Sequence, residues 1–281
     1  MVTDAISAAE ELPAGTPGKP CWVEVATGDP AGSAEFYSGL FDWEYRVGDD
    51  GYRVAMVDGI PVAGLYTPQG DQPQQWTLYL TVHDTNNTAE RVRQLGGEVL
   101  AEPREIPGQG GLLVAADPSG GPTGFWRQDR GWELGIGFPR AFTWAELYTW
   151  DGEAADAFYT ALFGFETTQI GDGEVYDYTT WSINGDDVLG RLRMGKEFPQ
   201  GRTPYWMVFF EAAPEIGVDE LGRRARRLGG AVAVAPFDSP YGRTAVLRDP
   251  RGAEFCVLDR SITVEADITE IGAEIDDPYG D

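Results

Sequence analysis

The chain has 281 residues, which is long enough for two ordinary domains, each with its own hydrophobic core. It carries 46 acidic and 21 basic residues, and this net charge of −25 repels phosphate backbones and anionic lipid surfaces. We therefore expect neither a nucleic-acid nor a membrane partner, and the absence of a signal-peptide pattern predicts a cytoplasmic protein.

After an N-terminal segment, residues 1–19, that we expect to be flexible, the first strand is predicted at Cys21 to Ala26. Its alternation places Trp22 and Glu24 on one face and the neighbouring valines on the other. Asp29-Pro30 is a typical start of a helix, because aspartate caps the free amides and proline fits the first turn.

Three short strands follow the helix, separated by turn sequences, and the same succession then begins again at Trp76. The second helix is predicted to end at Gly96-Gly97, a strong stop signal. Each half of the chain therefore contains two βαβββ modules.

The second half repeats the first. Trp22-Val23-Glu24-Val25 returns as Trp144-Ala145-Glu146-Leu147, and other motifs return in the same order. These further matches are Asp29 with Asp151, Phe36-Tyr37 with Phe158-Tyr159, Leu95-Gly96-Gly97 with Leu228-Gly229-Gly230, and Asp117-Pro118-Ser119-Gly120 with Asp249-Pro250-Arg251-Gly252. The predicted organisation is domain 1 at 20–128, a linker at 129–140, domain 2 at 141–260, and an acidic, flexible tail at 261–281.

This duplicated pattern resembles the vicinal-oxygen-chelate superfamily, which includes glyoxalases, bleomycin-resistance proteins and dioxygenases. The resemblance implies an α+β fold in which four βαβββ modules form two domains with cupped, mostly antiparallel sheets. The chain also resembles two-domain actinobacterial proteins, including accessory proteins of anthracycline biosynthesis.

The metal site of the superfamily's enzymes has no counterpart here. The resemblance implies a metal on the floor of the cup, held by histidine and glutamate on the first and last strands. The corresponding positions carry Trp22, Thr77 and Gly124 in one half and Trp144, Met207 and Cys256 in the other. These do not form a ligand set for a first-row transition metal, and the chain has a single histidine, His83. An all-carboxylate site through Glu24 or Glu146 lacks further ligands, so we expect no metal and no cofactor.

Without a metal, each cup is predicted to present aromatic rings and one glutamate. The side chains expected to bind a ligand are Trp22, Glu24, Thr77, Tyr79, Trp126, Trp144, Glu146, Met207 and Phe209. A tryptophan offers a flat face for stacking, and the glutamate could receive an amine or a hydroxyl. Core packing explains any single ring equally well. Arg53 or Arg127 is an alternative, structural partner for the glutamates.

Three functions are compatible with this pattern. The first is metal-independent binding or sequestration of a planar, hydrophobic molecule that can carry a positive charge, such as an aromatic polyketide or anthracycline-type antibiotic or its precursor. Such an accessory or self-resistance protein could also contact a biosynthetic enzyme of its pathway. The second is a metal-independent cyclase, isomerase or hydroxylase component with Glu24 or Glu146 as general base. The third is a metal-dependent glyoxalase or dioxygenase. The pairing of the modules, one with two or one with four, and the number of open cups stay undecided.

Overall fold

The computed structural model describes residues 15–68, 74–129 and 133–262. Module 1 consists of β1 (Pro20–Ala26), α1 (Pro30–Phe41), β2 (Glu44–Val47), β3 (Arg53–Val57) and β4 (Ile60–Tyr66). Module 2 consists of β5 (Trp76–Thr81), α2 (Thr85–Gln94), β6 (Glu98–Ile106), β7 (Gly110–Ala116) and β8 (Pro122–Gln128). Most of the expected N-terminal segment and of the acidic tail, residues 1–14 and 263–281, lies outside the described residues.

The second half repeats this order, as the sequence predicts. Module 3 consists of β9 (Phe142–Thr149), α3 (Gly152–Phe163), β10 (Glu166–Ile170), β11 (Tyr178–Ile183) and β12 (Asp186–Arg193). Module 4 consists of β13 (Tyr205–Glu211), α4 (Gly217–Arg227), β14 (Ala231–Ser239), β15 (Gly242–Arg248) and β16 (Glu254–Asp259). The expected βαβββ succession is confirmed in all four modules.

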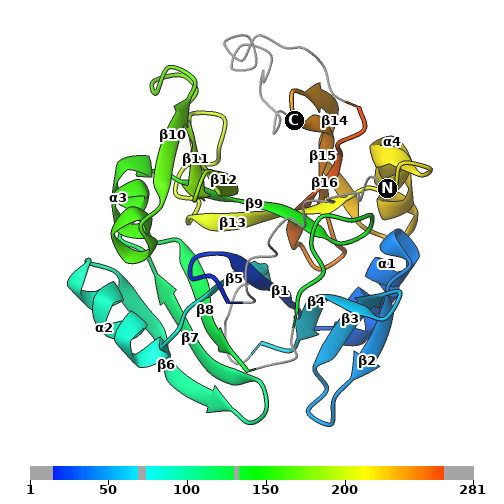
Figure 1. Cartoon of the computed structure of the whole chain (residues 1–281). Helices are drawn as coiled ribbons and strands as arrows, with labels where there is room; N and C mark the ends of the chain where they lie inside the picture. The colour runs from blue at the N-terminus through cyan, green and yellow to red at the C-terminus, as the bar shows by residue number, and fades with distance from the viewer. Residues whose placement is uncertain (1–14, 69–73, 130–132, 263–281) are drawn as a thin grey trace, which may run out of the picture.

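Two eight-stranded mixed sheets carry the fold (Figure 1). Their strand orders are β2-β3-β4-β1-β5-β8-β7-β6 and β10-β11-β12-β9-β13-β16-β15-β14. In each sheet the first strands of two consecutive modules pair antiparallel, β1 with β5 and β9 with β13. Module 1 therefore pairs with module 2 and module 3 with module 4, which decides between the two pairings left open by the sequence. The two-domain α+β fold is confirmed.

The helix starts follow the sequence signals. The Asp29 carboxylate accepts a hydrogen bond from the Gly32 amide, and Asp151 accepts one from Ala154. Each aspartate thus satisfies an amide that the first helical turn leaves unpaired. No helix of the described chain is long and apolar enough to cross a membrane.

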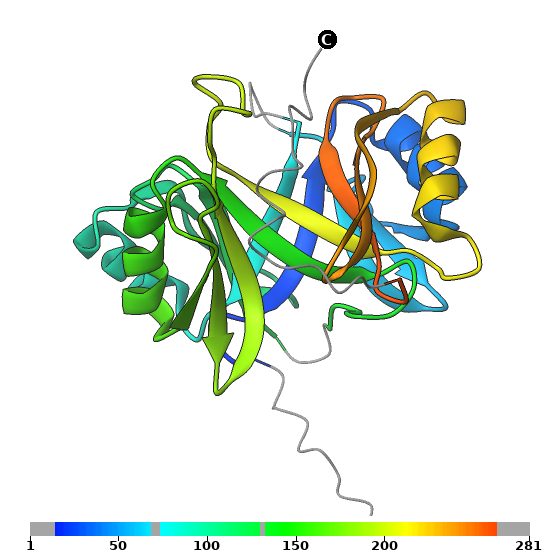
Figure 2. The ribbon, with the colours of Figure 1, turned by 90° about the horizontal axis from the view of Figure 1, so that it is seen from above.

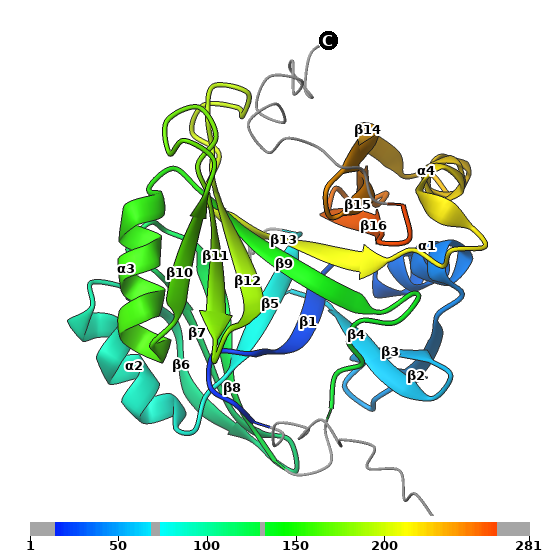
Figure 3. The ribbon, with the colours of Figure 1, turned by 45° about the horizontal axis from the view of Figure 1, so that its top comes forward.

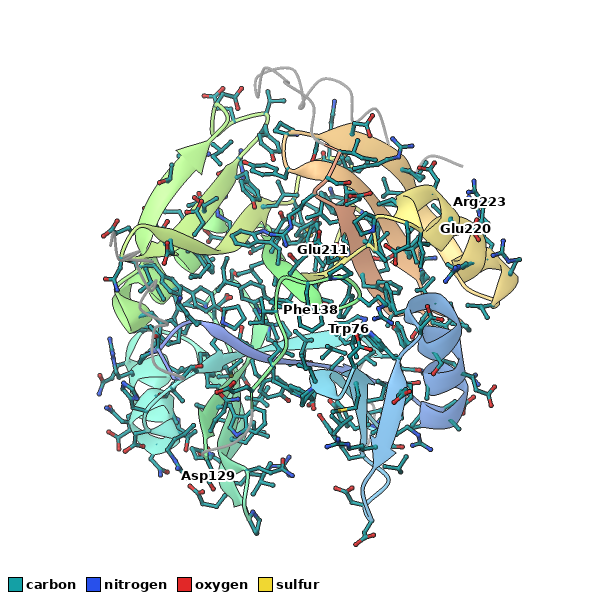
Figure 4. All side chains as sticks on the ribbon, turned by 45° about the vertical axis from the view of Figure 1, so that its right-hand side comes forward. Trp76, Asp129, Phe138, Glu211, Glu220 and Arg223 are labelled. Carbon is teal, nitrogen blue, oxygen red and sulfur yellow. The ribbon has the colours of Figure 1, made fainter. Side chains whose placement is uncertain are left out.

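The two sheets pack against each other through their convex sides, so the two cups open in opposite directions (Figures 1 and 2). Trp76 of β5 lies between the sheets in Figure 4 and packs edge-on against Phe210 of β13, with ring centroids 5.0 Å apart. At the flanks α1 lies beside α4, and α2 lies beside α3 (Figure 2). One continuous core therefore fixes both domains relative to each other.

The repeated Phe-Tyr and Asp-Pro motifs meet across this interface. The Tyr37 hydroxyl of domain 1 donates to Asp249 of domain 2 over 3.1 Å. The Tyr159 hydroxyl of domain 2 donates to Asp117 of domain 1 over 3.3 Å. The two bonds are reciprocal, which explains why the same motif pair stands in both halves of the chain.

Candidate functional site

A hydrogen-bonded series of tryptophan, tyrosine and glutamate lies on the floor of both cups. In domain 1 the Trp22 indole N–H donates to the Tyr52 hydroxyl over 2.8 Å, and Tyr52 donates to Glu24 over 2.6 Å. In domain 2 Trp144 donates to Tyr178 over 3.3 Å, and Tyr178 donates to Glu146 over 2.9 Å. Tryptophan and glutamate come from the first strand of the domain, whereas Tyr52 directly precedes the third strand and Tyr178 begins it. The floor is therefore duplicated together with the fold.

A glycine on the neighbouring strand makes room for each tyrosine. Gly64 of β4 pairs with Glu24, and Gly190 of β12 pairs with Glu146. A Cβ atom at Gly64 would collide with the Tyr52 hydroxyl, and one at Gly190 would collide with the Tyr178 hydroxyl. Only the missing side chain lets the phenol reach the carboxylate.

The first cup is filled by its own side chains. The Tyr79 hydroxyl donates to the second oxygen of Glu24 over 2.5 Å, so both carboxylate oxygens accept from tyrosine. Trp126 of β8 packs edge-on against Trp22 with centroids 6.3 Å apart, and its indole N–H donates to the Gln109 carbonyl. The exposed fractions of Trp22, Tyr79 and Trp126 are 2%, 4% and 3%. These rings form a packed cluster rather than an accessible binding surface.

The second cup, whose sheet is formed by β9–β16 (Figure 3), contains a cavity of about 340 Å³. Its floor includes Trp144, Glu146, Tyr178, Phe209 and Leu258, and its walls include Tyr148, Leu192 and Val246 together with Cys256. Trp144 and Glu146 are only partly buried. The cavity thus combines apolar walls with one carboxyl group on the floor, which is typical of small-molecule sites.

Two side-chain differences among the described residues explain why this cup is open where the first is filled. Phe209 takes the place of Tyr79, since each is the strand partner of the floor tryptophan. Leu258 takes the place of Trp126, at the same position of the domain's last strand. Leucine leaves the volume that the indole of Trp126 fills in domain 1, and phenylalanine lacks the hydroxyl that Tyr79 donates to Glu24.

The carboxyl group of Glu146 titrates near neutrality. Burial raises its pKa to about 7, although hydrogen bonds from Tyr178, Tyr148 and Trp144 partly offset this effect by favouring the charged form. Burial also raises the pKa of Glu24, and there two tyrosines, Trp22 and the positive charge of Arg104 oppose it. Glu146 forms no ion pair with a described residue, so its charge is held by neutral donors alone.

The mouth of the cavity in the second cup is also aromatic. Tyr176 comes from the β10–β11 loop, which is longer than its counterpart in domain 1. Phe237 and Tyr241 come from the β14–β15 hairpin, with 38% and 50% of their surface exposed. Asp187 and Arg260 complete the charged lining, and Arg260 is ion-paired with Glu211 over 2.8 Å.

The structure divides the residues predicted to bind a ligand into two groups. Trp144, Glu146 and Phe209 line the cavity, whereas Met207 is fully buried outside its lining. In domain 1 Trp22, Glu24, Tyr79 and Trp126 come together but are packed, and Thr77 pairs with Glu24 across the strands. A ligand-binding role for any of them stays a prediction.

The proposed arginine partners of the glutamates are wrong. Arg53 donates to the Gly51 carbonyl, and Arg127 is ion-paired with Glu105 and Asp129. Glu24 is stabilised instead by tyrosine hydroxyls. The physical reason is that Arg127 lies near the end of β8 with its side chain partly exposed, where the carboxylates of Glu105 and Asp129 are within reach.

Sequence reasoning missed Tyr52 and Tyr178, which complete the floor, and also the role of Leu258. A signal for the tyrosines was present. They are separated by the same distance along the chain as two similar turn sequences, Asp58-Gly59 in the first half and Asn184-Gly185 in the second. Nothing in the pattern distinguished Leu258 from an ordinary core leucine.

The residues at the superfamily's metal positions do not fit a transition metal. Trp22, Gly124 and Met207 offer no donor of the required kind, and the pKa of the Cys256 thiol is raised well above its usual value by burial, which disfavours the thiolate. The described residues bring together no group of three histidine, cysteine, aspartate or glutamate side chains that could hold a metal.

Comparison with known families accounts for the duplicated fold. Residues 22–126 match the family described as Glyoxalase-like domain, and residues 141–257 match the Glyoxalase/Bleomycin resistance protein/Dioxygenase superfamily. The chain belongs to this superfamily. Within it, the chain is 36% identical to the anthracycline biosynthesis protein DauV of Streptomyces sp. (strain C5), over 86% of this chain and 94% of that protein. The anthracycline biosynthesis protein DnrV of Streptomyces peucetius matches with the same identity and coverage.

Solved structures of the superfamily share the fold. A Mn(II)-bound glyoxalase from Novosphingobium aromaticivorans superimposes with a TM-score of 0.63 at 16% identity, covering 91% of this chain and 90% of that one. The 2,3-dioxygenase LapB from Pseudomonas sp. KL28 gives a TM-score of 0.64 at 14% identity, covering 87% and 93%. At these identities the likeness establishes the architecture of the two cups and not their chemistry.

Proposed function

We propose that the second cup binds a planar, hydrophobic small molecule of the aromatic polyketide class without a metal, so that the protein acts as an accessory or self-resistance protein of secondary metabolism. The observation that carries the proposal is the cavity of about 340 Å³ bordered by Trp144, Phe209 and Tyr241. Its volume and apolar lining suit a small aromatic ligand. The similarity to two anthracycline biosynthesis proteins supports the ligand class. Contact with a biosynthetic enzyme stays a prediction.

The test is a titration of the purified protein with a panel of planar aromatic antibiotics, followed by tryptophan fluorescence and repeated by calorimetry. Trp144→Ala should weaken binding by about tenfold or more, because it removes a stacking face from the floor. Trp22→Ala is the matched control, since Trp22 holds the same position in the filled cup. Saturable binding that responds to Trp22→Ala and not to Trp144→Ala would contradict the proposal, as would no binding across the panel.

A second candidate function is supported by the pKa of Glu146, which lies at about 7 in an apolar cavity. A carboxylate in this range can accept a proton from a bound substrate, so the cup could serve a metal-independent isomerase or cyclase with Glu146 as general base. Turnover of a bound polyketide that Glu146→Gln abolishes without weakening binding would favour this enzyme over the binding protein.

A further inference from the structure

We propose that the ligand of the second cup carries an ammonium group, and that this group is held between the Glu146 carboxylate and the aromatic walls of the cavity. The inference rests on the proposed function and adds to it the chemical group by which the ligand is recognised. It is supported by the charge balance of the cavity, by its rings and by the contrast with the first cup.

The charge balance of the cavity favours a cation. Glu146 forms no ion pair with a described residue, and the side chains that donate hydrogen bonds to it, Tyr178, Tyr148 and Trp144, are all neutral. Asp187 adds a second carboxylate to the lining and is hydrogen-bonded by the Ser182 hydroxyl. The one arginine among the lining residues, Arg260, is neutralised by Glu211. A cationic ligand would supply the missing counter-charge to a carboxyl group that burial otherwise holds partly protonated.

The rings of the cavity are suited to the same group. Trp144 and Phe209 belong to the floor, and Tyr148, Tyr176 and Tyr241 border it from the sides. Faces of aromatic rings carry negative potential and attract ammonium groups, most strongly where water is excluded. Aromatic walls around one carboxylate are a recurring arrangement for binding amines, whereas a neutral planar ligand can offer the carboxylate only an uncharged hydrogen bond.

The first cup, which is filled by its own side chains, shows how the equivalent glutamate, Glu24, is stabilised within the protein. Both oxygens of Glu24 accept hydrogen bonds from tyrosines, and Trp126 covers the floor. In the second cup Phe209 replaces one tyrosine donor and Leu258 leaves the floor accessible. Domain 2 therefore has the same carboxylate without the Tyr79 donor and with open space beside it.

The experiment compares two probes of the same shape by calorimetry, the cationic 2-(aminomethyl)naphthalene and the neutral 2-(hydroxymethyl)naphthalene. The amine should bind the wild-type protein about tenfold more tightly than the alcohol, as expected for one partly buried charge-assisted hydrogen bond. Glu146→Gln should abolish this preference. Glu24→Gln, the matched control in the filled cup, should preserve it.

A second readout separates a direct contact from a general effect of the protein's negative charge. Because the pKa of Glu146 is about 7, an ammonium ion beside it should drive the carboxyl group to ionise and release a proton near pH 7. The apparent binding enthalpy of the amine should then depend on the ionisation enthalpy of the buffer, and Glu146→Gln should remove that dependence. The alcohol should release no proton.

Three results would overturn the inference. If the alcohol binds as tightly as the amine, the cavity is a hydrophobic site without an amine preference, and the proposed function stands alone. If Glu146→Gln keeps both the preference and the proton release, the ammonium group lies elsewhere. If neither probe binds, the aromatic site itself fails together with the inference.

Discussion

The two cups share a backbone and a floor but differ in what occupies them. Both contain the tryptophan–tyrosine–glutamate series and the glycine that makes room for the tyrosine. In the first, Tyr79 and Trp126 close the floor, whereas in the second Phe209 and Leu258 leave it accessible. Two side chains on a duplicated scaffold therefore decide whether a domain has a packed core or a cavity.

This difference also separates the roles of the two glutamates. Glu24 is part of a satisfied hydrogen-bond network within a packed cluster, so its contribution is to the stability of domain 1. Glu146 lies on the floor of a cavity with a pKa of about 7 and is available to a ligand. The variants below exchange or remove the features that distinguish the cups.

The largest effect is expected from closing the second cup with the residue that closes the first. Leu258→Trp should place an indole in the cavity and weaken binding of a planar aromatic ligand by about 100-fold, the equivalent of losing one buried ring face. Fluorescence titration measures this loss. Trp126→Leu is the reciprocal control, which should cost about 2 kcal/mol of stability through cavity formation and leave binding unchanged. Undiminished binding by a folded Leu258→Trp protein would place the ligand elsewhere.

The next effect concerns the dependence of stability on pH. The carboxyl group of Glu146 has a pKa of about 7 when folded and about 4.5 when unfolded, so the folded state holds a proton that the unfolded state has lost. Stability should therefore fall as the pH rises through this window, and glutamine, which cannot ionise, avoids the loss. Glu146→Gln should match the wild type at pH 4 and exceed it by about 2–3 kcal/mol at pH 8.5 in urea unfolding. Equal stabilities at pH 8.5 would show that Glu146 ionises normally.

A smaller contrast is expected from the two glycines that accommodate the floor tyrosines. Gly64→Ala should cost about 1–3 kcal/mol, because the new methyl group meets Tyr52 and Trp22 inside a packed cluster. Gly190→Ala should cost less, since Tyr178 borders a cavity into which it can move. Denaturant midpoints of the two variants measure the difference, and an equal or reversed order would argue against the open second cup.

The smallest effect is expected from restoring the missing hydroxyl. Phe209→Tyr should place a phenol near Glu146 as Tyr79 does near Glu24, and a hydrogen bond to the charged form lowers a carboxyl pKa. The pKa of Glu146 should therefore fall below its value of about 7. The buffer-dependent proton release on amine binding at pH 7 would then decrease, and an unchanged release would show that the new hydroxyl does not reach the carboxylate.

Much of the fold could be predicted because its signals are local and duplicated. The alternation of Trp22 and Glu24, the Asp29 cap and the Gly96-Gly97 stop each specify an element through short-range physics, and the repeat confirms them. The floor residues Trp144, Glu146 and Phe209 followed from strand alternation in the same way.

The state of each cup could not be predicted, because it depends on contacts between distant segments. Trp126 fills the floor of the first cup only because β8 brings it next to Trp22. The residues around Leu258 in the sequence do not reveal whether the space beside its side chain is filled or empty. The arginine partners failed for a similar reason. The prediction of an arginine partner considered only opposite charges and so overlooked the Tyr52 hydroxyl. Tyr52 can donate to Glu24 across the sheet only because Gly64 has no side chain.

The most direct test of the account is the number of ligand molecules bound per chain. Equilibrium dialysis with a fluorescent anthracycline should give one molecule per wild-type chain. The domain 1 control Glu24→Gln should also bind one molecule, and Leu258→Trp should bind none at the same concentrations. Two molecules per chain, or one that persists in Leu258→Trp and disappears in Glu24→Gln, would contradict the claim that domain 2 alone holds the open site.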